Sequence, residues 1–119
     1  MIKVAVDKNA AGGNIVTLLE ELVAVWQDKV LTVPAGFSCD GCSAPEFLWD
    51  SVSPAIDPRT LRAALVHDFI YRTHPAGWSR KEADELFYDF AREDGLSWLR
   101  AQKAYWGLRL FGGLNWEVS

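Results

Sequence analysis

The stretch that decides the fold covers residues 59–90 and reads RTLRAALVHDFIYRTHPAGWSRKEADELFYDF. Its first part is apolar around most of the helical circumference, which is typical of a helix buried by its neighbours. Pro75 and Gly77 interrupt the pattern. Ser79 and Glu82 then form a capping box, in which each side chain accepts a hydrogen bond from a backbone N–H at the helix start. The stretch predicts two helices joined by a short break.

The limits of the predicted helices follow from their capping residues. The first helix is expected to begin at Asp57-Pro58, because an Asp side chain accepts from early backbone N–H groups and Pro suits the first turn. It should run to about residue 71 or 72. The second is expected to be amphipathic and to end at Gly95, and a third to run from about Ser97 to the glycine pair at 112–113.

Residues 1–36 carry the pattern of short strands. Three runs rich in β-branched residues predict strands, namely residues 2–6, 22–27 and 30–33. Asp28-Lys29 is the expected turn of a hairpin, and Pro34 ends its second strand because it cannot donate to a ladder. Residues 17–22 also suit a helix start, since Leu and Glu favour helices, but a strand is favoured because little room remains before Pro34.

These elements predict an α+β fold, in which a small N-terminal antiparallel sheet or hairpin packs on three C-terminal helices. A chain of 119 residues, half of them hydrophobic, is long enough to bury one core. We expect one domain over residues 1–119. Its parts are a β-rich segment (1–36), a polar loop with a short helix at 45–52 (37–56), and a helical segment (57–112).

The charge of the chain bears on its partners and location. A net charge of -4 argues against a nucleic-acid partner, because affinity for phosphates comes mostly from Lys and Arg. Four basic residues near the C-terminus can form a stripe or only a solvated face: Arg92, Arg100, Lys103 and Arg109. No apolar run approaches the roughly 18 residues of a membrane span, and the first residues lack a basic segment followed by a long apolar run, so we expect a protein that is cytosolic when made.

The first predicted helix contains an ionisable pair, His67 and Asp68, among apolar residues. Burying such groups costs several kcal/mol unless each is hydrogen-bonded, so each needs a partner. Adjacent helical residues point about 100 degrees apart, so the two partners should differ. Tyr71 lies within one turn of both. If the two long helices pack antiparallel, Asp84 comes roughly opposite the second half of the first helix and can orient the His67 ring.

Two roles are open for this cluster. If Asp84 binds one nitrogen of the His67 ring, the other nitrogen can act as a general base, as in many hydrolases. Alternatively, His67, Asp68, Tyr71 and Asp84 form a structural hydrogen-bond network that fixes the helices. Burial and access to a solvent-connected pocket separate the two roles.

The loop after the strands carries a second polar cluster, with Cys39, Asp40, Cys42 and Ser43. Asp40 can cap a helix or bind a cation, and Ser43 is the expected N-cap of the helix at 45–52. The two cysteines have the spacing of a redox dithiol or of half a zinc site. His67 and His74 would complete a Cys2His2 set, although the gaps match no common zinc module.

The order of these motifs resembles the phage and prophage family catalogued as domain of unknown function 1353. The motifs are VPAGF (33–37), Asp40-Gly41-x-Ser43-x-Pro45, His67-Asp68-x-x-Tyr71 and SR-x-x-AD-x-x-F (79–87). The resemblance covers about residues 20–112, but the family usually has Thr or Val before the Asp and Ala after the Gly, where this chain has Cys39 and Cys42. It implies a phage product, often encoded among tail or late genes, with no settled activity.

The helix pair is also similar to the core of secreted phospholipases A2. That resemblance implies that His67 is the base, Asp68 a calcium ligand and Asp84 the group that orients the ring. Asp40 and Asp68 would then be ligands of a divalent cation, calcium or zinc. The chain lacks the many cysteines and the glycine-rich calcium loop of those enzymes.

The leading functional hypothesis is a phage accessory protein, tail-associated or assembly-related, made in the host bacterial cytoplasm and located in the virion tail. Its partners would be phage structural proteins, bound through an exposed apolar patch of Trp98, Trp106, Phe111 and Trp116. The alternative is a small phage hydrolase that uses His67 with Asp84, assisted by a metal.

Overall fold

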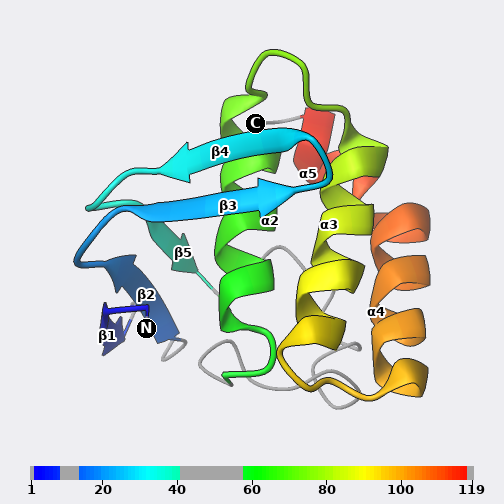
Figure 1. Cartoon of the computed structure of the whole chain (residues 1–119), viewed down its shortest axis with the longest axis horizontal. Helices are drawn as coiled ribbons and strands as arrows, with labels where there is room; N and C mark the ends of the chain where they lie inside the picture. The colour runs from blue at the N-terminus through cyan, green and yellow to red at the C-terminus, as the bar shows by residue number, and fades with distance from the viewer. Residues whose placement is uncertain (1, 9–13, 41–57, 118–119) are drawn as a thin grey trace.

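The computed structural model describes residues 2–8, 14–40 and 58–117, so the predictions for Cys42, Ser43, the helix at 45–52 and Asp57 lie outside the described residues. The strands in these ranges are β1 (Val4–Lys8), β2 (Asn14–Leu18), β3 (Leu22–Trp26), β4 (Lys29–Val33) and β5 (Ser38–Asp40). The helices in the same ranges are α2 (Leu61–Thr73), α3 (Arg80–Glu93), α4 (Trp98–Phe111) and α5 (Gly113–Glu117). The α+β fold predicted from the sequence is confirmed, with small antiparallel sheets before the three long helices (Figure 1).

The strands form two small antiparallel sheets. One has the order β1-β2-β5 and the other is the β3-β4 hairpin. In β3 the side chains alternate, so Ala24 and Trp26 are buried while Val23 and Val25 face solvent. The predicted strand at 17–22 is divided between β2 and β3, and the alternative helix start does not form.

The hairpin turn lies one residue earlier than the sequence predicts. Trp26 pairs with Lys29, so the turn residues are Gln27 and Asp28 instead of Asp28 and Lys29. Gln27 adopts a left-handed conformation with φ 53°. A shift of one residue would turn every side chain of one strand to the opposite face, so burial of Trp26 fixes the register.

The helix limits agree with the capping signals, with two corrections. α2 begins at Leu61 with Thr60 as its N-cap, later than the predicted start at Asp57-Pro58. The Ser79-Glu82 capping box is present, and Gly95 after α3 has a left-handed φ of 105°. Gly112 keeps right-handed angles, so α5 follows α4 directly where the sequence predicts an end.

α2 is the central element of the helical layer. It packs against α3, and the β3-β4 hairpin crosses these helices (Figure 1). Eight of its 13 residues are buried, as the lack of a polar face predicts, and these include both His67 and Asp68. None of the helices that the structure describes is long and apolar enough to span a bilayer. α2 therefore brings the ionisable pair into the core.

Candidate functional site

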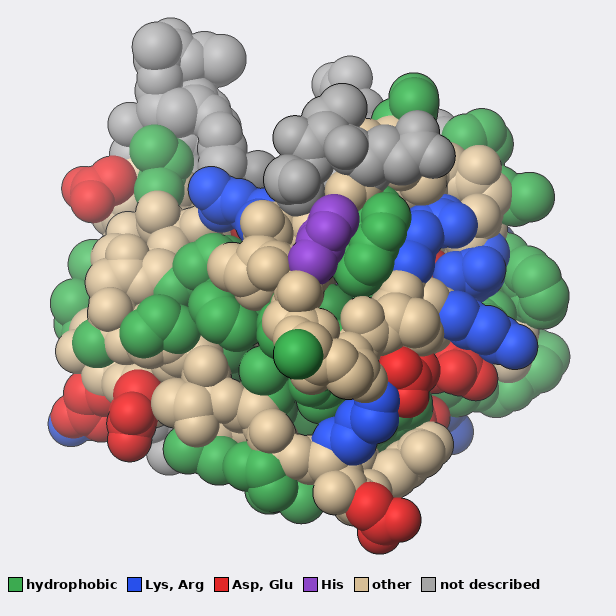
Figure 2. Space-filling model, turned by 90° about the horizontal axis from the view of Figure 1, so that it is seen from above, with side chains coloured by type: hydrophobic (Ala, Val, Ile, Leu, Met, Phe, Trp, Pro, Cys, Tyr) green, Lys and Arg blue, Asp and Glu red, His purple; other side chains and the backbone are tan. Residues whose placement is uncertain are grey.

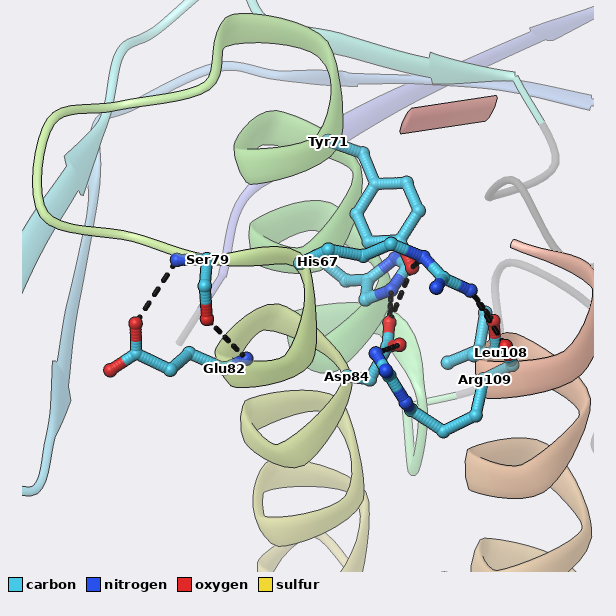
Figure 3. Close-up of polar contacts among 8 residues, drawn as sticks. His67, Tyr71, Ser79, Glu82, Asp84, Leu108 and Arg109 are labelled. Carbon is cyan, nitrogen blue, oxygen red and sulfur yellow. Dashed lines mark hydrogen bonds and ion pairs between the residues drawn. The ribbon is translucent and has the colours of Figure 1, made fainter. Parts of the chain in front are cut away.

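Asp84 of α3 is the centre of a buried polar cluster that joins three helices (Figure 3). Its Oδ1 lies 2.8 Å from Nε2 of His67 and accepts a 2.6 Å hydrogen bond from the Tyr71 hydroxyl, both from α2. Its Oδ2 accepts a 2.9 Å hydrogen bond from Nη1 of Arg109 in α4. We call His67, Tyr71, Asp84 and Arg109 the Asp84 cluster.

Arg80 extends the cluster to the C-terminal end of α4. Its Nε donates to the Tyr71 hydroxyl at 3.2 Å. Its Nη2 donates to the carbonyls of Leu108 and Arg109 at 2.6 and 2.8 Å. The last carbonyls of a helix lack partners within the helix and carry partial negative charge, so a guanidinium stabilises them. Arg80 therefore links Tyr71 to the end of α4.

Gly112 allows these groups to approach one another. A Cβ at this position would lie 2.5 Å from the Leu108 carbonyl oxygen and 2.8 Å from the Tyr71 hydroxyl. Such contacts are too short for any side chain, so only glycine fits without a shift of α4. Trp116 of α5 covers the same region, with its ring edge-on to Tyr71 at 5.4 Å.

His67, Tyr71 and Asp84 are sealed from solvent, whereas the Arg109 side chain is partly exposed, and the cluster favours an ionised Asp84. Asp84 is 0% and His67 1% exposed. Burial acts to raise the pKa of Asp84, but hydrogen bonds from His67, Tyr71 and Arg109 together hold it below its ordinary value. Burial and the Asp84 carboxylate raise the pKa of Tyr71. The ion pair with Arg109 compensates the charge of Asp84.

The hydrogen bond to Asp84 fixes the His67 tautomer. A carboxylate can only accept, so the proton lies on Nε2 and the neutral ring has its lone pair on Nδ1. The rings of Tyr71 and Phe87 pack on the imidazole, with centroids at 4.1 and 5.6 Å. The predicted pairing of His67 with Asp84 is therefore present.

Asp68 has its own partner, as the sequence predicts. Its Oδ2 accepts from Nη1 of Arg72 at 3.1 Å, and the same nitrogen donates to the carbonyl of Ser38 in β5 at 2.7 Å. Asp68 is thus tied through Arg72 to the small sheet, whereas His67 faces α3. Tyr71, which lies within one helical turn of both His67 and Asp68, donates its hydroxyl hydrogen bond to Asp84.

Asp68, a predicted cation ligand, pairs with Arg72 in the described structure, and Nη1 of Arg72 also bonds the carbonyl of Ser38. No group of three His, Cys, Asp or Glu side chains suited to a metal occurs in the described ranges. The Asp40 side chain and Cys42 lie outside these ranges. The cation site at Asp40 and Asp68 and the redox dithiol of Cys39 and Cys42 therefore stay predictions.

The histidines and Cys39 are not gathered into a Cys2His2 set in the part of the chain described. Cys39 is buried in β5, where it pairs with Val16. His67 binds Asp84, and His74 stacks on Trp116 with ring centroids 3.9 Å apart. The two histidines therefore serve different contacts.

Sequence reasoning missed Arg80, Arg109 and Gly112. The sequence analysis offers a basic stripe or a solvated face for Arg109, but this side chain turns inward to Asp84, and Arg92 bonds the carbonyl of Leu96. Nothing in the spacing of α4 distinguishes Arg109 from its solvent-facing neighbours. Lys and Arg side chains do gather on the upper face of the molecule, but Asp and Glu side chains lie beside them (Figure 2).

Three of the four residues predicted to form an exposed apolar patch are exposed. Trp98, Trp106 and Phe111 are more than half exposed, whereas Trp116 is half-buried against His74 and Tyr71. Leu99, Leu110 and Leu114 are exposed as well and were not predicted. The exposed apolar surface is therefore larger than the aromatic residues alone suggested.

One family model matches this chain. Its description is Protein of unknown function (DUF1353), and it covers residues 16–108. The matched range includes His67, Tyr71 and Asp84, and it ends one residue before Arg109. Neither the curated proteins nor the solved structures contain a match.

Proposed function

This chain belongs to the DUF1353 family, as its motifs predict, and from that premise we propose that it is a phage or prophage accessory protein. It acts by binding a phage structural protein during assembly, most simply in the tail. The Asp84 cluster then has a structural role and holds α2, α3 and α4 in the arrangement that the binding surface needs.

The observation that carries this proposal is the apolar row on the outer face of α4. Leu99, Trp106 and Leu110 lie at positions i, i+7 and i+11, on one side of the helix. All three are more than half exposed. The opposite side, with Ala101 and Ala104, is buried against the core. An apolar face left outside the core in this way is typical of an interaction site.

The sealed His67 ring supports a structural role for the Asp84 cluster. A general base has to reach its substrate, and this ring is 1% exposed. Nε2 of the ring is bound by Asp84, and the rings of Tyr71 and Phe87 pack on the imidazole. The burial and these contacts favour a structural network over a catalytic pair.

Assembly of particles tests the proposal. A phage lacking the gene is complemented with the wild-type chain or with a Leu99→Ser/Leu110→Ser variant, and particle yield and composition are measured. We expect the variant to fold but to give defective or fewer particles. A Val23→Ser/Val25→Ser variant is the matched control, since it removes equally exposed apolar side chains from β3. Normal particles from the α4 variant would contradict the proposal.

A second candidate function is hydrolysis, and the ring tautomer favours it. Because Nε2 donates to Asp84, Nδ1 is the ring nitrogen that would take a proton from an attacking water. By the resemblance to phospholipases A2, the substrate would be a phospholipid ester, split into a fatty acid and a lysolipid.

Hydrolysis is tested with phosphatidylglycerol vesicles and the purified chain. The second candidate predicts that fatty acid is released and that His67→Gln abolishes release while the variant stays folded. A His74→Gln variant, changed at the exposed histidine that follows α2, controls for loss of one imidazole. Absence of release by the wild-type chain would dismiss this candidate.

A further inference from the structure

A groove between β3, α3 and α4 is lined by aromatic rings and carboxylates. It has a volume of about 270 Å³, and its walls include Trp26, Tyr88, Glu85, Asp89, Tyr105 and Trp106. This volume lies just below the roughly 300–1,000 Å³ of pockets for drug-sized ligands, so the groove suits a single side chain or a similarly small group. It is separate from the Asp84 cluster, with which it shares no residue.

The same combination of groups binds a cation elsewhere in this chain. The ammonium of Lys29 lies 4.7 Å from the centre of the Trp78 ring and 2.6 Å from Oε2 of Glu82. The guanidinium carbon of Arg62 lies 3.9 Å from the Phe90 ring centre, and its Nε donates to Asp94 at 3.0 Å. An aromatic face beside a carboxylate attracts a cation through both the ring quadrupole and the opposite charge.

A third example has the same form. The guanidinium carbon of Arg72 lies 5.3 Å from the centre of the Phe37 ring, and its Nη1 is 3.1 Å from Asp68. In all three cases the cation comes from the chain itself, and the carboxylate lies on α2 or α3 or directly after α3. The fold therefore holds three of its own Lys and Arg side chains in the same way, between an aromatic ring and a carboxylate.

In the groove, aromatic rings lie beside carboxylates, and the described residues that line it include no Lys or Arg. Glu85 and Asp89 continue the face of Glu82 along α3, at spacings of three and seven residues. Among the described residues, neither forms an ion pair with a Lys or Arg. Asp89 accepts a 2.7 Å hydrogen bond from the Trp26 indole, which keeps one carboxylate oxygen turned towards the aromatic wall. The groove thus presents negative charge and ring faces together.

Hydrogen bonds fix the aromatic wall of the groove. Burial raises the pKa of Tyr105, and the charge of Glu85 acts in the same direction while Arg109 opposes it. Gln102 donates to the Tyr88 hydroxyl and accepts from the Trp106 indole, at 3.3 and 3.2 Å. These bonds hold two of the aromatic rings in place, so little ordering is needed when a ligand enters.

We propose that this groove binds a Lys or Arg side chain of the partner protein, with the cation between the aromatic rings and the carboxylates of Glu85 and Asp89. The inference deepens the proposed function, on which it rests for the identity of the partner. Trp106 belongs to both surfaces, so a partner lying along the apolar row of α4 can place a basic residue in the groove.

Arginine binding to the isolated chain tests the inference without the partner. N-acetyl-arginine amide is titrated into ¹⁵N-labelled protein, and the indole N–H signals of Trp26 and Trp106 are followed. We expect both signals to shift, and the affinity to fall as salt is added. N-acetyl-citrulline amide has the same shape without the charge, and we expect it to bind far more weakly.

Matched variants identify the carboxylates. Glu85→Gln/Asp89→Asn should weaken arginine amide binding by about tenfold, as expected for two partly exposed charge pairs. Glu93→Gln, on the same helix but outside the groove, should leave it unchanged. Equal binding of citrulline amide, an unaffected double variant, or no shift with arginine amide would each overturn the inference. If N-acetylglucosamine shifts the two indole signals and arginine amide does not, the groove is a sugar site and the inference is overturned.

The Leu99→Ser/Leu110→Ser variant separates this inference from the proposed function. Both leucines lie outside the groove, so the variant should bind arginine amide like the wild-type chain. If it binds normally and also assembles normally, the assembly role fails while the cation site stands. If the wild-type chain does not bind arginine amide but the variant still fails in assembly, the cation site fails alone.

Discussion

Nε2 of His67 and Oδ1 of Asp84 lie 2.8 Å apart inside the protein, although 17 residues separate them in the chain. The contact exists because α2 and α3 pack side by side with both residues on their facing sides. Tyr71 and Arg109 complete the shell of the carboxylate, so one buried anion connects three helices. The predictions below follow from this arrangement.

Removal of the Asp84 charge should destabilise the fold strongly. Asp84→Asn leaves Arg109 and the Tyr71 hydroxyl with a weaker acceptor inside the core, and breaking a buried pair of this kind costs about 3 kcal/mol or more. Urea unfolding followed by circular dichroism measures the effect. Asp28→Asn on the exposed turn should change the free energy of unfolding by less than about 0.5 kcal/mol. Equal stabilities of the two variants would show that the Asp84 cluster is not structural.

Stability should fall in acid because of Asp84. Its pKa in the folded protein lies below the ordinary value of about 4, so the carboxylate stabilises the fold above that pH. This contribution is lost as the pH falls through the lower, folded pKa. The difference in unfolding free energy between the wild-type chain and Asp84→Asn should therefore become smaller as the pH is lowered from 7 to below about 4. A constant difference over that range would contradict the assignment.

Loss of the Tyr71 hydroxyl should have a smaller effect. Tyr71→Phe keeps the ring against His67 and Trp116 but removes the bond to Asp84 and the acceptor for Arg80. A hydrogen bond to a charged group contributes about 2 kcal/mol, so we expect a loss of that size in urea unfolding. Tyr88→Phe, which alters a hydroxyl at the groove, is the control. A larger loss in the control than in Tyr71→Phe would be inconsistent with this account.

Two neighbouring glycines should respond in opposite ways to alanine. At Gly112 a Cβ would lie 2.5 Å from a backbone oxygen and 2.8 Å from the Tyr71 hydroxyl, so Gly112→Ala should cost about 1–3 kcal/mol. At Gly113 the nearest atom outside the neighbouring residues would lie 3.8 Å away, in Arg80, so Gly113→Ala should be neutral or stabilising. Thermal unfolding of the two variants checks the contrast. A neutral Gly112→Ala would mean that α4 does not approach α2 this closely.

Local signals predicted much of this fold because they act within a few residues. The Ser79-Glu82 capping box and the left-handed Gly95 depend only on neighbouring backbone groups, and both appear where expected. The hairpin turn is one residue off because burial of Trp26 decides its register, and burial is a property of the whole fold.

The sequence predicted only those contacts of the candidate site that lie within one pair of consecutive helices. His67, Tyr71 and Asp84 lie on two consecutive helices joined by a short break, so antiparallel packing brings them together. Arg80 and Arg109 join the cluster because α4 docks with its C-terminal end over α3, which no spacing in the sequence reveals. The role of Gly112 depends on the same docking.

A double-mutant cycle between His67 and Asp84 tests the structural role of the Asp84 cluster most directly. The free energies of unfolding of His67→Ala, Asp84→Asn and the double variant are compared with that of the wild-type chain. This account predicts that each single variant is destabilised and that the two changes are coupled by about 1–3 kcal/mol. A His67→Ala chain as stable as the wild type, with changes that add within about 0.5 kcal/mol, would contradict it.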